Sequence, residues 1–192
     1  MIRCGKFLLL SFFFCYSSTL WAQSKAGITG VRDTSYTTAS EYKKLSKTYP
    51  FIQVAEQAHL ASVKVSKGLV YCNSGNRKLL LDAFGPAKQT NQKKAAIILL
   101  HGGGWRSGNR EQHHALAQQL AALGYVCFTP EYRLSTEALY PAALHDAKAA
   151  VRWVRQQAAT YNIDTNKIAI GGFSAGGILA TLLGTTNGQK GF

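Results

Sequence analysis

Acidic residues are scarce in this chain of 192 residues, which has nine Asp and Glu against 22 Lys and Arg and a formal net charge of +13. A balance of this kind is typical of proteins that bind nucleic acid or an anionic surface. The basic residues, however, lie singly or in pairs such as Lys43-Lys44 and Lys93-Lys94, without interleaved aromatic residues. We therefore predict a solvated basic surface and no nucleic-acid partner.

Cysteine is also scarce, and only Cys72 and Cys127 lie beyond the first 22 residues. Each is part of an apolar run that is typical of a strand, GLVYC and YVCF. Cysteine in such a run is often a small buried hydrophobic residue, so we predict free buried thiols and no disulfide. No group of His, Cys, Asp or Glu has the spacing of metal ligands, and we expect neither a metal nor a cofactor.

The N-terminal segment differs in character from the rest of the chain. Arg3 and Lys6 form a basic start, Phe7–Leu20 is an apolar run, and Ala22 is a small residue at which a signal peptidase can cut. This order is typical of a secretory signal peptide, and the apolar run is short for a membrane span. We predict a signal peptide at 1–22, a secreted or periplasmic protein, and no stable membrane insertion once the peptide is removed.

The remainder divides into an extension and a domain. Residues 23–60 are polar and show no clear period, and we interpret them as an N-terminal extension that crosses the domain surface, with a short helix around 40–48. Residues 61–192 carry the apolar patterning of a folded domain. One domain of this length has a real hydrophobic core.

Within the domain, strand-like and helix-like segments alternate. The strands are predicted at 63–71, 78–84, 95–100, 125–129 and 167–171, and the helices at 110–123, at 141–158 and from 178, with a turn at 162–166. The first two strands are expected to form a hairpin. The alternation that follows gives the fold class α/β, with a mainly parallel sheet covered by helices on both faces. In such sheets the chemistry gathers at the carboxyl ends of the strands.

One of these strand ends carries a serine between two glycines, in the pattern Gly172-x-Ser174-x-Gly176. It lies between a predicted strand and a predicted helix, which is the setting of a nucleophile elbow. The spacing has a steric cause, because strand and helix approach so closely that only small residues fit two positions to either side of the serine. Ser174 is therefore our candidate nucleophile.

A second glycine-rich turn follows another strand, as HGGGW at 101–105. Attack on an ester needs hydrogen-bond donors for the oxyanion, and glycine lets a ligand oxygen approach the main chain. The N–H groups of Gly103, Gly104 and Ala175 are our candidate donors. An ordinary flexible loop is the alternative, whereas a phosphate-binding loop is disfavoured because no Gly-Lys-Ser/Thr follows.

Three motifs, HGGGW (101–105), EYRL (131–134) and GFSAGG (172–177), resemble the α/β-hydrolase superfamily. The resemblance is to its carboxylesterase/acetylesterase branch, which is related to hormone-sensitive lipase and to bacterial feruloyl-esterase-like domains. It implies that Ser174 is the nucleophile. It also implies that His101 and Gly102 shape the loop without acting as the base, and that Trp105 lines the acyl or alcohol pocket or simply packs.

The resemblance also implies parts that this sequence lacks. In these hydrolases the triad acid and histidine follow the serine, but residues 175–192 contain no Asp, Glu or His. About five of eight expected strands are present, so we interpret the chain as the N-terminal part of such a domain, with 167–171 as an edge strand. Four other candidates for the base are predicted to be solvated or local structural residues and are not assigned: His113, His114, His145 and Asp146.

We therefore predict an exported serine esterase by family, acting on small esters such as acetylated or feruloylated carbohydrate, and inactive or impaired as this fragment. A peptidase of the prolyl-oligopeptidase type is the first alternative. The HGGGW loop and the lack of room for a propeller domain argue against it. A non-catalytic binding protein that retains the fold is the second alternative.

Overall fold

The computed structural model describes residues 26–55, 57, 60–88 and 90–189. The predicted signal peptide at 1–22 lies outside these residues. Among the described residues, no helix is both long enough and apolar enough to span a bilayer. The domain boundaries proposed from the sequence at 22/23 and 60/61 remain predictions.

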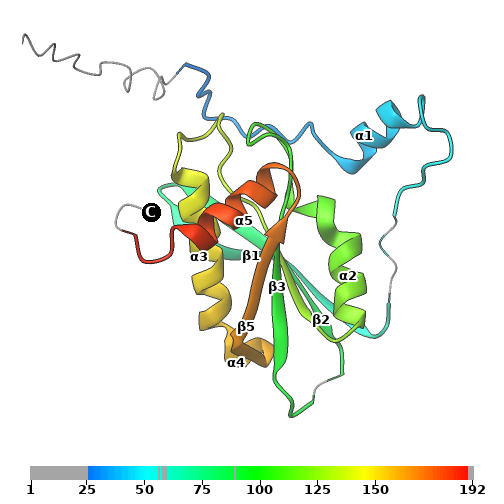
Figure 1. The fold of residues 1–192 in the computed structure, drawn as a ribbon, viewed down its shortest axis with the longest axis vertical. Helices are drawn as coiled ribbons and strands as arrows, with labels where there is room; N and C mark the ends of the chain where they lie inside the picture. The colour runs from blue at the N-terminus through cyan, green and yellow to red at the C-terminus, as the bar shows by residue number, and fades with distance from the viewer. Residues whose placement is uncertain (1–25, 56, 58–59, 89, 190–192) are drawn as a thin grey trace, which may run out of the picture.

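A sheet of five strands forms the centre of the molecule (Figure 1). The strands are β1 (Val63–Ser74), β2 (Arg77–Pro86), β3 (Lys94–Leu100), β4 (Val126–Pro130) and β5 (Ile163–Gly172), in the spatial order β1-β2-β4-β3-β5. β1 and β2 form the predicted antiparallel hairpin, and β3 runs parallel to both β4 and β5. The predicted α/β class with a mainly parallel core is confirmed.

Helices cover both faces of this sheet. They are the 3₁₀ helix η2 (Arg110–His113) continued by α2 (His114–Ala122), α3 (Ala142–Gln156), α4 (Ala158–Tyr161) and α5 (Ala175–Thr185), whereas α1 (Thr38–Leu45) lies away from the sheet. α2 packs on one face, where Ala117 and Ala121 meet Phe84 and Cys127. α3 and α5 pack on the other face against the larger apolar cluster, which includes Ile98, Leu100, Phe128, Leu144 and Val154. Figure 1 shows α2 and the α3–α5 pair on opposite sides.

The strand that leads into the serine turn lies at the edge of the sheet, as predicted. The predicted turn at 162–166 is wrong in its extent, because β5 already begins at Ile163. Asn162 has a left-handed φ of 53°, and its amide donates to the carbonyls of Thr90 and Gln92. The predicted turn survives as a register shift between Ile163 and Ile168, where the Asp164 carboxylate accepts the N–H of Asn166. Ile163 is 1% exposed, so burial in the core favours its inclusion in the strand.

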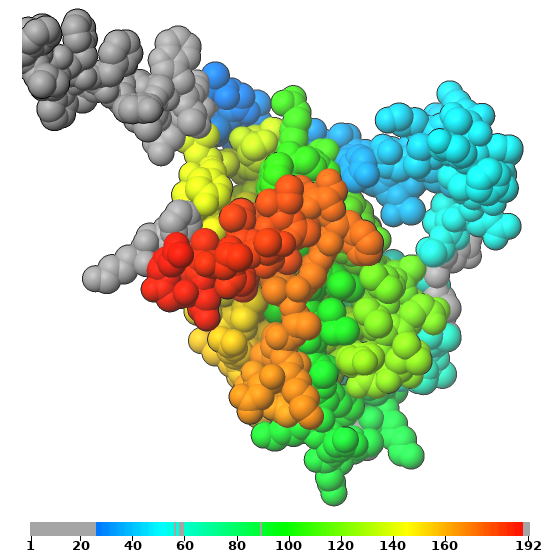
Figure 2. All heavy atoms as spheres, viewed as in Figure 1, coloured from blue at the N-terminus to red at the C-terminus, as the bar shows by residue number. Residues whose placement is uncertain are grey.

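The N-terminal extension forms the short helix that its sequence predicts. Thr37 and Ser40 cap α1 reciprocally, each side chain accepting the other residue's backbone N–H. No residue of α1 is buried. In the space-filling view the light-blue and cyan atoms of α1 and the residues after it bulge from one side of the body (Figure 2).

Both described cysteines are free, in agreement with the sequence. Burial raises the pKa of the Cys127 thiol to about 12, so this side chain is a neutral hydrophobic residue at any physiological pH. Cys72 is only half-buried, which corrects the expectation that both thiols are fully enclosed.

Candidate active site

Ser174 occupies a strained turn between β5 and α5. Its φ of 52° and ψ of −121° lie outside the regions that a non-glycine residue ordinarily adopts. The serine is exposed at the apex, whereas Ala175, the first residue of α5, is buried. Strain of this kind persists only where the surrounding structure enforces it, and it clusters at functional sites.

The two flanking glycines show what enforces the turn. A Cβ on Gly172 would lie 2.6 Å from the carbonyl carbon of Gly176 and 2.5 Å from the carbonyl oxygen of Leu100. A Cβ on Gly176 would overlap with that same Leu100 oxygen and lie 2.6 Å from the carbonyl oxygen of His101. The strand, the helix and the end of β3 are therefore packed backbone to backbone around the serine.

The second glycine-rich turn meets the first one directly. We call residues 101–108 the glycine loop; it follows β3, whose last residue Leu100 pairs with Gly172. A Cβ on Gly102 would lie only 3.6 Å from the Cβ of Ser174. The parallel register of β3 and β5 thus brings together the two turns that the sequence places at the carboxyl ends of strands.

The glycine loop contains three consecutive residues with positive φ: Gly103 at 121°, Gly104 at 61° and Trp105 at 59°. Glycine adopts such angles freely, but tryptophan does so at a cost of about 1 kcal/mol. The Gly103 carbonyl accepts the N–H groups of Arg106 and Ser107 at 3.1 and 3.0 Å, which closes the turn. The loop has the sharp, donor-rich backbone that an oxyanion hole requires.

His101 is fully buried at the base of this loop. Its ring stacks on Tyr132 with centroids 4.3 Å apart, and its Nδ1 lies 2.8 Å from the carbonyl oxygen of Gly102. Since a carbonyl only accepts, Nδ1 carries the proton and donates. Burial lowers the pKa of His101 to about 4, so the ring is neutral at pH 7. These contacts fit the loop-shaping role that the resemblance implies.

The low pKa of His101 predicts a pH-dependent stability. Above about pH 6.5 the ring is neutral in both the folded and the unfolded chain, so it adds no pH dependence. Between about pH 6.5 and 4 the unfolded chain binds a proton that the folded chain excludes, and stability falls by up to about 3 kcal/mol. His101→Asn, whose amide N–H replaces Nδ1–H, should flatten this slope in urea titrations followed by Trp fluorescence, whereas His145→Asn at an exposed position should not. An unchanged slope in His101→Asn would contradict the assignment.

His113 and His114 are buried, and the prediction that they are solvated is wrong. His113 has its Nε2 at 3.1 Å from the Leu100 carbonyl oxygen and its ring against Phe173, and burial lowers its pKa. His114 points away from the serine turn, and its Nε2 lies 2.8 Å from the Oδ2 of Asp82 in β2. Both rings are enclosed because each has a different neighbour, Phe173 beside His113 and Phe84 beside His114.

Asp146 is buried, which excludes the surface alternative predicted for it and favours the local structural one. Its carboxylate accepts the backbone N–H of Arg133 and two hydrogen bonds from the Arg133 guanidinium, at 2.7 to 2.9 Å. This forked pair ties α3 to the segment that follows β4. His145, on the preceding position, is exposed.

None of these groups reaches the serine. Within the part of the chain that the structure describes, no side chain forms a hydrogen bond with the Ser174 hydroxyl. The same residues contain no group of three His, Cys, Asp or Glu that could hold a metal ion. Within the described residues, the site therefore presents a candidate nucleophile and a candidate oxyanion hole, without a general base in hydrogen-bond contact with Ser174.

The largest feature that the sequence did not predict is an ion-pair cluster centred on Glu131. Its fully buried carboxylate pairs with Arg32, Arg77 and Arg110. Arg110 also binds Asp82 at 2.9 Å, and Asp82 in turn meets His114. The sequence signals are that Glu131 begins the EYRL motif and directly follows the apolar run of β4, and neither names its partners.

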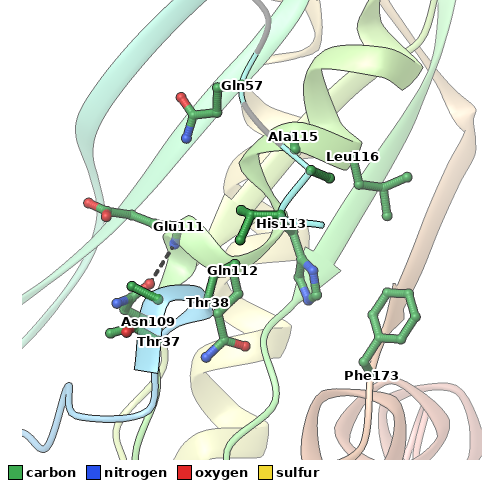
Figure 3. Close-up of a pocket in the computed structure, with 13 residues that line it drawn as sticks. Thr37, Thr38, Gln57, Asn109, Glu111, Gln112, His113, Ala115, Leu116 and Phe173 are labelled. Carbon is green, nitrogen blue, oxygen red and sulfur yellow. Dashed lines mark hydrogen bonds between the residues drawn. The ribbon is translucent and has the colours of Figure 1, made fainter. Parts of the chain in front are cut away.

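Two hollows lie near the two turns, one lined by Phe173 and the other by Trp105, and Ser174 lines neither of them. The wider one, about 750 Å³, lies between the N-terminal extension, the η2–α2 segment and Phe173. Figure 3 shows its polar wall, with Thr37, Thr38 and Asn109, and its apolar wall, with Leu116 and Phe173. The narrower one, about 310 Å³, is mostly apolar and is lined by Trp105, Leu139, Tyr140, Leu179 and Leu182. Trp105 thus both lines a hollow and packs against the core.

A family model with the description BD-FAE matches residues 81–192, which is more than half of the chain. The chain belongs to this family. The resemblance to the hormone-sensitive-lipase-like branch of the α/β-hydrolases is confirmed, and the lineage is that of ester hydrolases.

Individual relatives agree with this placement of the BD-FAE chain. Esterase LipC of Mycobacterium tuberculosis is 35% identical over 108 residues, which are 56% of this chain and 27% of LipC. An ethyl acetate hydrolase of Pseudomonas putida is 40% identical over 90 residues, 46% of this chain and 28% of that protein. The thermophilic esterase Est2 of Thermogutta terrifontis matches in structure with a TM-score of 0.58 and 33% identity, over 66% of this chain and 45% of Est2. The match therefore spans about a quarter of the length of LipC and of the ethyl acetate hydrolase, and less than half of Est2.

Proposed function

We propose that this chain carries the nucleophile and oxyanion hole of an exported carboxylic-ester hydrolase. The observation that carries the proposal is the direct contact of two strained turns, with Ser174 at one apex and Gly102 beside it. Ser174 is the nucleophile. The N–H groups of Ala175, Gly103 and Gly104 are the oxyanion donors.

The reaction follows from these roles. The Ser174 Oγ attacks the ester carbonyl carbon, its proton passes to a base, and the carbonyl oxygen becomes an oxyanion. Collapse of this intermediate expels the alcohol, which takes up a proton, and leaves an acyl-serine. Water then attacks the acyl-serine, releasing the acid and restoring the hydroxyl.

The two hollows support a substrate in which a small acyl group is esterified to a larger polar alcohol. The apolar hollow beside Trp105 suits an acyl chain, and the wider hollow beside Phe173 offers hydroxyl and amide side chains to a sugar. The relative named ethyl acetate hydrolase supports a short acyl group. We propose acylated carbohydrate as the substrate class. The peptidase alternative loses support, because the relatives compared carry names of esterases and lipases.

The 192-residue chain is expected to be impaired, because residues 175–192 supply neither acid nor histidine. Loss of the base from a serine triad lowers the rate by several orders of magnitude. Hydrolysis of a fluorogenic acetate ester should therefore not exceed that of Ser174→Ala. Turnover that Ser174→Ala abolishes would show that a base is present after all.

An added base tests the nucleophile itself. Imidazole in solution can accept the hydroxyl proton, so an activated acetate ester with imidazole should acetylate Ser174, as found by mass spectrometry of peptides. Ser174→Ala should carry no adduct at this peptide. Acetylation confined to lysines, with Ser174 unmodified, would favour the non-catalytic binding protein.

Export remains part of the proposal and rests on the basic start, the apolar run and Ala22. Expression of the whole chain in a Gram-negative host should give a processed product that begins at Gln23. N-terminal sequencing of the periplasmic fraction measures this directly. An unprocessed chain in the cytoplasm would contradict it.

A further inference from the structure

Residues 29–37, the N-terminal strap, cross the end of the sheet at which β5 passes into α5 (Figure 1). They lie more than sixty positions before the glycine loop in the sequence, yet they contact it. The strap is joined to the domain at its start, where the N–H groups of Thr29 and Gly30 both donate to the carbonyl of Thr136 at 2.9 Å. Apart from Thr37, which lines the wider hollow, this segment has no part in the proposed reaction so far.

The glycine loop needs restraint from outside. Three successive residues have positive φ angles, one of them Trp105. This loop conformation is unfavourable unless contacts with the rest of the protein hold it in place. Internal bonds of the Gly103 carbonyl close one turn, and the Trp105 carbonyl accepts from Ser135 at 2.7 Å. These bonds leave the beginning of the loop at Gly102 and its end at Gly108 to be held by other elements.

The strap holds both ends. The carbonyl of Asp33 accepts the N–H of Gly108 at 3.2 Å. The carbonyl of Tyr36 accepts a hydrogen bond from the Gln112 amide at 3.1 Å, and the oxygen of that amide accepts the N–H of Gly102 at 3.2 Å. The Tyr36 ring also lies against Gly103, since its Cδ1 would be 3.3 Å from a Cβ there.

Arg32 fixes the strap in this position. Its guanidinium pairs with the buried carboxylate of Glu131, which also binds Arg110 of η2 at 3.3 Å. The strap and the helix that carries Gln112 are therefore anchored to one buried group. A shift of the strap would break both the direct bond to Gly108 and the bridge to Gly102.

We infer that the N-terminal strap is a positioning element for the oxyanion donors, and that Arg32 and Tyr36 set the conformation of residues 102–108. The catalytic part of this inference rests on the proposed ester hydrolysis. Its structural part, the restraint of the loop, does not. Arg32 and Tyr36 act through the loop and do not touch the reacting atoms.

Arg32→Gln tests the inference in the full chain. Glu131 keeps Arg77 and Arg110 in this variant, so the domain should still fold. Hydrogen–deuterium exchange of peptides covering 102–108 should quicken by about tenfold or more, while exchange in β3 stays unchanged. Imidazole-supported acetylation of Ser174 should fall by a similar factor, with Arg32→Lys recovering part of both effects. Lys44→Gln, on the exposed surface of α1, should change neither.

The two readouts separate the possible failures. Faster exchange in both β3 and the loop would reduce the strap to a general stabilising role and overturn the inference. Unchanged exchange in the loop of Arg32→Gln would overturn it as well. If no variant is acetylated at Ser174, the proposed function fails, and selective exchange of residues 102–108 still decides whether the strap restrains the loop.

Discussion

Gly176→Ala is expected to lower the free energy of unfolding by at least about 3 kcal/mol and to remove the site. The added methyl would overlap with the Leu100 carbonyl oxygen and lie 2.6 Å from the His101 carbonyl oxygen. These are backbone atoms of β3 and the glycine loop, which cannot rotate away as a side chain can. Relief requires α5 to move off the sheet, and with it Ala175 and the turn at Ser174.

Two other glycines of α5 provide matched controls. Nothing lies within 4 Å of a Cβ on Gly184, so Gly184→Ala should stabilise the helix by about 0.5–1 kcal/mol. A Cβ on Gly177 would lie 3.1 Å from the Gly172 carbonyl oxygen, so Gly177→Ala should fall between the two. Urea unfolding followed by circular dichroism ranks the three variants. Equal effects for Gly176→Ala and Gly184→Ala would show that the strand–helix approach is not what selects glycine.

The sequence predicted this turn because its constraints are local. A glycine two positions before and after Ser174 is a requirement that residues in one short segment impose on one another. The neighbouring glycine loop was equally predictable, since carboxyl ends of adjacent parallel strands meet at one edge. The sequence did not predict the order of the strands in the sheet. The structure shows that β3 and β5 are paired in parallel, which brings the two turns together. The roles of the individual site residues remain predictions.

The buried polar groups were not predictable in the same way. His113 and His114 were expected in solvent because adjacent residues on a regular helix cannot share one face. They are buried on different sides by distant partners, His113 by Phe173 and His114 by Asp82. Asp146 likewise is buried by Arg133, thirteen positions away. Charge in a sequence favours solvent exposure unless its partner is known, and the partner comes from the fold.

The same reasoning applies most strongly to Glu131. Its three arginines come from the strap, from the start of β2 and from η2, at positions 32, 77 and 110. Its carboxylate also accepts the backbone N–H of Leu80 at 3.0 Å. No spacing rule joins these residues in sequence. One buried charge nevertheless connects three elements around the glycine loop.

Glu131→Gln is therefore expected to cost about 3–5 kcal/mol, the usual loss when one member of a buried ion pair is removed. The amide can still accept from Leu80, so the change isolates the charge. It leaves three guanidinium groups facing one another without a counter-ion at the centre of the cluster, and Arg77 keeps only its pair with Glu137 at 2.8 Å. Asp164→Asn removes the exposed pair with Lys167, at 3.7 Å, and should cost less than about 0.5 kcal/mol.

Urea unfolding of both variants at low and high salt measures the difference. The loss in Glu131→Gln should persist at high salt, because a buried carboxylate is screened little, whereas any loss in Asp164→Asn should vanish. Exchange of residues 102–108 should also quicken more in Glu131→Gln than in Arg32→Gln, since Glu131 anchors both the strap and η2. A Glu131→Gln protein as stable as the parent would mean that the arginines are held by solvent and neighbouring carbonyls. The cluster would then have no part in fixing the loop beside Ser174.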